Sequence, residues 1–225
     1  NTLYVGSDGG IYIAENTGDV TNDYYKDLTT GMGIRQFYKI GVSQTDPVVV
    51  SGGSQDNGTS VMKGENGDWY DWLGADGMES FVHHTDPNIL YGTSQSGSLY
   101  KSTNGGNSRT SLTKPETTGN WVTPFTMDPV NANTLYVGYV EIYKSTNSGT
   151  SWTAISSLGG SKADHIVVAP SNTQYIYIEK GNTLYRTSSG GGSWTQINIP
   201  TGNGSPNCIA VDPDNHLRIA VGTSW

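Results

Sequence analysis

The chain has 225 residues, of which 30 are Gly, 14 are Tyr and only 14% are charged. Its 20 acidic and 12 basic residues give a net charge of -8, which argues against nucleic acid as a partner because affinity for a phosphate backbone comes from Lys and Arg. No apolar run reaches the roughly 18 residues that a membrane-spanning helix needs, so membrane insertion is not expected.

The residue types favour an all-β protein from outside the cell. Tyr, Val, Ile and Thr recur in short clusters separated by Gly, Asn, Asp and Ser, which is typical of strands joined by turns. Cys208 is the single cysteine, so no internal disulfide is expected. The sequence starts at Asn1 without an initiator Met or a leader, and we expect a processed chain or an excerpt. Few Lys and many small polar residues favour a secreted or cell-surface protein of bacterial origin.

An internal repeat runs through the whole chain with a period of about 42 residues. Each unit carries a turn followed by a short apolar run, as in "TDPNILYGT" from Thr85 and "MDPVNANTLYVG" from Met127. The prolines of these turns are Pro47, Pro87, Pro129, Pro170 and Pro213. A fixed period of this length indicates a repeat architecture.

Each unit is predicted to form four short strands, A to D. In the best-preserved unit these strands are 164–169, 175–179, 183–187 and 194–199. Four antiparallel strands in about 40 to 45 residues are the signature of a β-propeller blade, which must stack on its neighbours to bury both apolar faces. We therefore interpret residues 1–225 as a single β-propeller domain or part of one.

The strand count predicts an incomplete ring. The chain opens at "NTLYVG" and ends at "LRIAVGTSW", and both match strand B of the repeat. We expect three strands of a first blade, four whole blades and two strands of a sixth, so that about five blades form an arc of a larger propeller. The alternative is a closed five-bladed ring with a spare terminal strand.

Three carboxylates are predicted on one face of the arc, in B-to-C turns and D-to-A connections: Asp8, Asp56 and Asp76. Each lies within two residues of a Gly, which lets a ligand approach the backbone. They could serve acid–base chemistry on a glycosidic bond or bind Ca²⁺ with loop carbonyls. The alternative is that these are simply favourable hairpin turns. No spacing of His and Cys predicts a zinc site, and no cofactor other than Ca²⁺ is suggested.

The N-terminal segment "YVGSDGGIY", from Tyr4, resembles a segment near the start of xyloglucan-degrading endoglucanases. The resemblance implies that Asp8 is a catalytic carboxylate. The general acid of those enzymes comes from a second propeller, which this chain does not contain.

The second unit contains "SQDNGT" followed by "GDWYDWLGADG". This pattern is similar to large secreted propellers of Bacteroidetes that are often exported by the type IX pathway. Trp69, Tyr70 and Trp72 could form a sugar-stacking platform, although packing at a blade edge is the alternative. The ligand-binding residues proposed from this unit are Gln55, Asp56, Asn57, Asp76, Trp69 and Trp72.

The C-to-D turn is the best-repeated motif, with "YKSTNGGNSR" from Tyr100, "YKSTNSGTSW" from Tyr143 and "YRTSSGGGSW" from Tyr185. It resembles the Asp-box, or BNR, repeat of sialidases, sortilin-type ectodomains, xyloglucan-degrading glycosidases and secreted bacterial propellers. The resemblance implies a structural role, and the residue types suit a turn. The residues assigned to this structural set are Ser102, Asn104, Gly106, Ser145, Asn147, Gly149, Trp152, Thr187, Gly191 and Trp194.

Sialidase activity is not expected. It needs three arginines converging on a carboxylate, because guanidinium groups bind carboxylates in a bidentate manner. The four arginines, Arg35, Arg109, Arg186 and Arg218, fall on strands A, D, C and B of different units. Arg109 and Arg186 are expected to point away from a central channel.

The sequence therefore favours a secreted or cell-surface β-propeller that binds an extracellular protein or glycan, or has a structural role, within a larger polypeptide. The alternative is the N-terminal part of a glycoside hydrolase of the xyloglucanase type, so enzymatic activity stays open.

Overall fold

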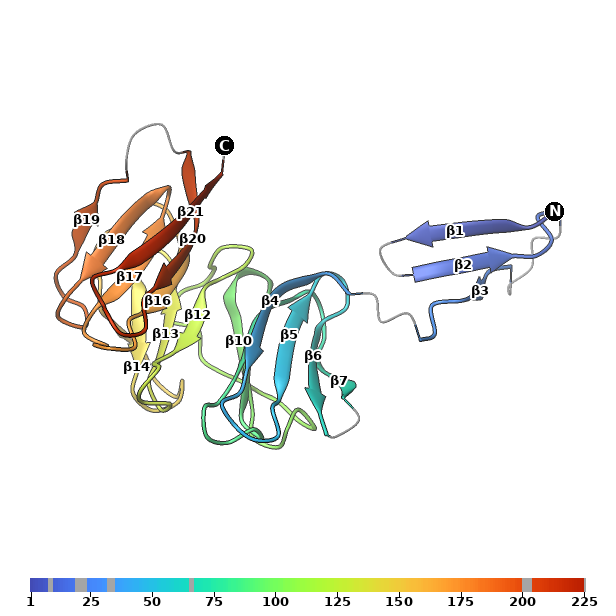
Figure 1. Cartoon of the computed structure of the whole chain (residues 1–225), viewed down its shortest axis with the longest axis horizontal. Coiled ribbons are helices and arrows are strands. Elements are labelled where there is room, and N and C mark those ends of the chain that lie inside the picture. Colours follow the sequence, from blue (N-terminus) through green and yellow to red (C-terminus); the bar gives the residue numbers. More distant parts are fainter. Residues whose placement is uncertain (8–9, 19–23, 32–34, 65–66, 200–203, 225) are drawn as a thin grey trace.

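A computed structural model describes residues 1–7, 10–18, 24–31, 35–64, 67–199 and 204–224. Within them lie six antiparallel sheets, each built from strands that are consecutive in sequence (Figure 1). We number these sheets blades 1 to 6 in chain order. Blade 1 contains β1 (Leu3–Ser7), β2 (Gly10–Ala14) and β3 (Lys26–Asp27).

Blades 2 to 5 are complete four-stranded meanders. Blade 2 contains β4 (Phe37–Val42), β5 (Val50–Ser54), β6 (Thr59–Lys63) and β7 (Asp68–Leu73). Blade 3 contains β8 (Gly77–Val82), β9 (Leu90–Ser94), β10 (Ser98–Ser102) and β11 (Thr110–Ser111), with the short helix η1 (Gln95–Gly97) between its second and third strands.

The remaining strands follow the same order. Blade 4 contains β12 (Phe125–Met127), β13 (Leu135–Gly138), β14 (Ile142–Ser145) and β15 (Thr153–Ala154). Blade 5 contains β16 (Ala163–Val168), β17 (Ile176–Lys180), β18 (Thr183–Thr187) and β19 (Thr195–Ile197). Blade 6 contains β20 (Ser205–Val211) and β21 (Ile219–Ser224). The prediction of three strands, four whole blades and two further strands is confirmed.

The hydrophobic core lies between blades rather than within them. One cluster joins Tyr91 and Leu99 of blade 3 to Phe125 and Met127 of blade 4. Similar clusters join blades 2 and 3 and blades 4 and 5. Each buried aliphatic or aromatic side chain contributes roughly 1.5–3 kcal/mol, so packing against a neighbour stabilises each blade.

The C-to-D turns also link neighbouring blades. Gly149 has φ +85°, and a Cβ added there would lie 2.7 Å from Cδ1 of Leu112 in the preceding blade. Ser145 Oγ accepts the backbone N–H of Gly149 at 2.9 Å, and Asn147 Oδ1 accepts that of Ser151 at 2.9 Å. The turn that begins at Ser102 makes the same bonds. Only Gly satisfies both the backbone angle and the close approach.

Blades 2 to 6 follow one another along a curved arc, whereas blade 1 stands apart from blade 2 (Figure 1). No helix among the described residues is long and apolar enough to cross a membrane.

Candidate ligand-binding site

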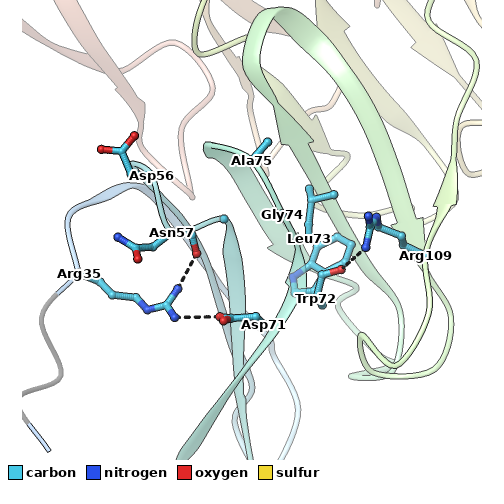
Figure 2. A pocket seen from close by; sticks show the side chains of 10 residues that line it. Arg35, Asp56, Asn57, Asp71, Trp72, Leu73, Gly74, Ala75 and Arg109 are labelled. Atoms are coloured by element: carbon cyan, nitrogen blue, oxygen red, sulfur yellow. Dashed lines mark hydrogen bonds and ion pairs between the residues drawn. The ribbon is translucent and has the colours of Figure 1, made fainter. Parts of the chain in front are cut away.

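A polar pocket of about 380 Å³ lies where blade 2 meets blade 3 (Figure 2). It is formed by the residues before β4, the turn between β5 and β6, the end of β7 and the C-to-D turn of blade 3. Its lining residues are Arg35, Asp56, Asn57, Gly58, Asp71, Trp72, Leu73, Gly74, Ala75 and Arg109. Its volume falls within the range of small-molecule sites, about 300–1,000 Å³.

Arg35 forms one wall and is held on three sides. Its Nη2 lies 2.9 Å from Asp71 Oδ1, and its Nη1 donates to the carbonyl oxygen of Asn57 at 2.8 Å and to Ser60 Oγ at 2.6 Å. Ser60 Oγ also donates to the same Asp71 oxygen at 2.5 Å. The guanidinium group is therefore fixed before any ligand arrives, which reduces the entropy lost on binding.

Arg109 forms the opposite wall from the next blade. It occupies the last position of the C-to-D turn, where the turns of blades 4 and 5 carry Trp152 and Trp194. Its Nη1 donates to the carbonyl oxygen of Trp72 at 3.3 Å (Figure 2). Among the described residues this is its single protein partner, so the other guanidinium N–H groups of this exposed side chain are available to a ligand.

Asp56 is presented by a turn that Asp76 stabilises. Asp56 has φ +57°, and its backbone N–H donates to Asp76 Oδ1 at 2.6 Å. The other oxygen of Asp76 accepts Nε2 of Gln95 at 2.7 Å. Asp76 thus ties the turn of blade 2 to that of blade 3 and is a positioning residue, whereas the Asp56 carboxylate is exposed at the pocket (Figure 2).

The residues proposed from the sequence are only partly brought together. Asp56 and Asn57 line the pocket, and Asp76 supports it from outside the lining. Gln55 is half-buried and donates its backbone N–H to the carbonyl oxygen of Gln36 at 3.0 Å.

The structure argues against a sugar-stacking platform of Trp69, Tyr70 and Trp72 and favours the alternative of packing for Trp72. The Trp72 side chain is only 4% exposed, packs in the core between blades 2 and 3, and donates Nε1 to Ser51 Oγ at 3.2 Å. Trp69 and Tyr70 are exposed but neighbour each other on one strand, so they point to opposite sides of the sheet. Trp69 contacts Phe37, with ring centroids 5.6 Å apart. These three side chains therefore cannot stack on one sugar.

Asp8 lies outside the described residues, so its predicted catalytic or Ca²⁺-binding role stays a prediction. Across the part of the chain that the structure describes, no group of three or more His, Cys, Asp or Glu side chains could hold a metal ion.

The sequence did not predict that Arg35 and Arg109 line one pocket, because arginines were expected to bind a ligand only around a central channel. The pocket is instead between blades, and Arg35 and Arg109 come from different units. One usable signal was the replacement of the repeated Trp by Arg109, since a charged residue in a packing position suggests another role.

A second polar region joins blades 4 and 5. The Glu141 carboxylate accepts the Ser156 hydroxyl and the backbone N–H groups of Leu158 and Gly159. Burial opposes its ionisation, but these hydrogen bonds prevail and lower the pKa of Glu141. Lys180 donates to the carbonyl oxygens of Val140 and Ser161, and burial lowers its pKa. The groups satisfy one another, so we interpret this network as structural.

Glu79, on strand β8 of blade 3, has an unusually high pKa. Glu79 Oε1 lies 4.0 Å from Lys39 Nζ, and its side chain is 19% exposed. Burial raises the pKa of Glu79 to about 7, against the opposing effect of Lys39. Such a group is poised to change its charge near neutral pH.

Comparisons with known proteins give no sequence-level family. No protein-family model matches the chain, and no curated protein matches its sequence. Solved structures do match. A glycoside hydrolase family 74 (GH74) enzyme of Niastella koreensis is 22% identical with a TM-score of 0.67, covering 95% of this chain and 38% of that one. The chain has a β-propeller fold.

Two further structures support that fold. The GH74 xyloglucanase of Xanthomonas campestris is 17% identical with a TM-score of 0.57, covering 78% of this chain and 33% of its own. An extracellular domain assigned to a hybrid two-component system of Bacteroides thetaiotaomicron is 13% identical with a TM-score of 0.63, covering 99% of this β-propeller chain and 30% of that one. The chain thus spans about a third of the proteins that it resembles.

Proposed function

We propose that this chain is a glycan-binding segment of a secreted or cell-surface bacterial β-propeller, with the pocket between blades 2 and 3 as its binding site. The observation that carries the proposal is the convergence of the fixed Arg35–Asp71 pair with the exposed Asp56 and Arg109 on one cavity. Donors and acceptors held in a fixed arrangement suit the hydroxyl groups of a sugar.

The charges of the pocket favour a neutral saccharide. Arg35 is paired with Asp71, and the two other charged lining residues, Asp56 and Arg109, have opposite charges. A free anion would meet two carboxylates, and a cation would meet two guanidinium groups. Sugar hydroxyls can donate to the carboxylates and accept from the guanidinium groups, so a neutral polyol uses both.

The wider setting is also part of the proposal. The repeated C-to-D turns resemble Asp-box turns of BNR-type and sortilin-like propellers, and the second unit resembles type IX-exported propellers. An extracellular location is supported by the composition and by the likeness to an extracellular bacterial domain. We propose that residues 1–225 form part of a larger propeller polypeptide, which supplies further blades or protein contacts.

A glycan array followed by isothermal titration calorimetry tests the binding function. We expect binding of neutral gluco-oligosaccharides with weaker or no binding of polygalacturonate, and a loss of about tenfold in affinity for Asp56→Ala. Arg218→Ala, which removes an exposed arginine of blade 6 paired with Asp212, is the matched control and should bind as wild type. No signal on any neutral glycan would reject the proposal and favour a protein partner or a purely structural role.

The second candidate is the N-terminal part of a glycoside hydrolase of the xyloglucanase type. It is supported by the likeness to GH74 enzymes and by the "YVGSDGGIY" segment with Asp8. Release of reducing ends from a β-glucan panel by the full-length protein, with Asp8→Asn as the control, tests it. Equal activity of wild type and Asp8→Asn would exclude Asp8 as the catalytic carboxylate.

A further inference from the structure

Blades 1 and 2 each expose apolar side chains at repeat positions that are buried at the later junctions. The large exposed apolar side chains of the two blades include Leu3, Tyr4, Tyr25, Leu28, Phe37, Ile40, Val42, Val48, Trp69 and Tyr70. Blade 1 stands away from blade 2 in the structure (Figure 1). The repeat identifies what each face is built to meet.

Tyr4 is the clearest marker on blade 1. It occupies the second position of the second strand of its repeat unit, as do Tyr91, Tyr136 and Tyr177, and all four face the third strand in the same register. The three later tyrosines are 0–2% exposed, whereas Tyr4 is 65% exposed. Tyr91 is buried by packing against the following blade. By the same register, Tyr4 faces the place of blade 2.

Blade 2 offers the matching surface. Ile40 and Val42 pair with the second strand of their blade in the register in which Phe125 and Met127 pair within blade 4. Phe125 and Met127 are 2% and 7% exposed because blade 3 covers them, whereas Ile40 and Val42 are 60% and 54% exposed. The face that receives the preceding blade is thus present on blade 2 but uncovered.

Leu28 occupies a position from which it could contact blade 2. It donates its backbone N–H to the carbonyl oxygen of Ile11 at 2.9 Å, as Leu112 does to Leu99 at 2.9 Å. The Leu112 side chain packs against Gly149 in the C-to-D turn of the following blade. Leu28 therefore holds the position that reaches toward the C-to-D turn of blade 2.

Trp69 is the partner that the repeat predicts for Leu28. It follows Met62 by seven residues, the spacing that separates Thr187 from Trp194. Trp194 donates Nε1 to the carbonyl oxygen of Ile155 at 2.8 Å, and Ile155 holds the Leu28 position in its own blade. Among the described residues, the indole N–H of Trp69 has no hydrogen-bond acceptor.

The connection is long enough for the two faces to meet. Residues 28–36 join β3 to β4, which is nine residues, and residues 155–162 join β15 to β16 with eight. The shorter connection already allows blade 5 to pack on blade 4 through a shared core. Nine residues can span about 30 Å when extended.

We propose that blade 1 docks on the exposed apolar face of blade 2, with Tyr4 and Leu28 against Ile40, Val42 and Trp69, and with the Trp69 indole N–H donating to the Leu28 carbonyl oxygen.

Two measurements on the full chain test this proposal: the solvent exposure of Trp69 and the maximum dimension of the molecule. Subtracting the signal of Trp69→Phe isolates the Trp69 fluorescence, and acrylamide quenching reports its exposure. Placing a carboxylate in the apolar junction with Tyr4→Asp should raise the Trp69 quenching constant about threefold and increase the maximum dimension measured by small-angle X-ray scattering. Tyr12→Asp, on the opposite face of the same sheet, is the matched control and should do neither.

A milder pair of substitutions covers the case in which Tyr4→Asp unfolds blade 1. Docking predicts that Leu28→Ala and Trp69→Phe have non-additive effects on the unfolding of the chain, because they remove two sides of one contact. Additive effects, or a wild-type Trp69 that is quenched as readily as in Tyr4→Asp, would overturn the proposal.

Discussion

The carboxylate of Asp76 accepts the backbone N–H of Asp56 at 2.6 Å, so the connection between blades 2 and 3 holds the turn that presents Asp56 to the pocket. The second Asp76 oxygen accepts Gln95, which extends the same constraint to the helix η1 of blade 3. The Asp76 side chain thus links the turns of blades 2 and 3 through two hydrogen bonds.

Replacing this carboxylate should weaken both the turn and the site. Asp76→Ala removes two acceptors, and we expect a loss of about 2 kcal/mol in unfolding free energy together with about tenfold weaker saccharide binding. Asp76→Asn keeps an acceptor for the Asp56 N–H and allows Gln95 to present its own carbonyl oxygen, so it should recover most of both. Urea unfolding and calorimetric titration measure the two effects. Wild-type affinity in Asp76→Ala would show that the turn does not depend on Asp76.

Substitution of Arg109 should weaken saccharide binding without a large loss of stability. Arg109→Trp installs the residue type found at the same turn position in blades 4 and 5, where Trp194 donates to the preceding blade. We expect its stability to stay within about 1 kcal/mol of wild type while saccharide affinity falls about tenfold, because the charged donors are lost. Arg109→Ala should lose affinity and also the bond to the Trp72 carbonyl oxygen. Full affinity in Arg109→Trp would remove Arg109 from the binding site.

The fold could be predicted from the sequence because its information is local and repeated. A turn such as that of Asn147 and Gly149 recurs in register with the strands, so the order and number of strands follow from the repeat. Strand A of the best-preserved unit, predicted over 164–169, is observed as β16 (Ala163–Val168). Each blade needs only its own residues to define its meander.

The candidate site was only partly predictable, for two physical reasons. The ion pair of Arg35 and Asp71 joins residues 36 positions apart, and neither has a sequence feature that indicates the other. Trp72 looks like a surface aromatic in "DWYDWL", but the strand face that carries it packs on blade 3, and that packing is a property of the assembled blades. Alternation along a strand indicates two faces without saying which one a neighbour covers.

The glycine of the C-to-D turn should be essential to the junction between blades 3 and 4. Gly149→Ala places a Cβ 2.7 Å from Leu112 at a φ of +85°, and we expect a loss of about 2 to 4 kcal/mol from backbone strain and overpacking. Gly159→Ala is the matched control, because its φ of +58° carries the strain but no atom lies within 4 Å of the added Cβ. It should cost about 1 kcal/mol. Equal losses in denaturant unfolding would argue that the turn does not fasten neighbouring blades.

Glu79 should make the stability of the chain fall as pH rises toward neutrality. Its pKa is about 7 in the folded chain, against 4.5 for an ordinary Glu, because burial disfavours the carboxylate. The folded state therefore holds the proton more tightly, and its contribution to stability is fully present below pH 4.5 and is lost as pH rises through about 7. The loss amounts to about 3 kcal/mol. Glu79→Gln cannot ionise, so this loss should be absent from its unfolding free energy, which should exceed that of wild type at pH 8. Glu15→Gln removes an exposed carboxylate paired with Lys26 and should keep the wild-type slope. Urea unfolding from pH 4 to pH 8 measures all three proteins, and a wild-type slope in Glu79→Gln would assign the effect to another group.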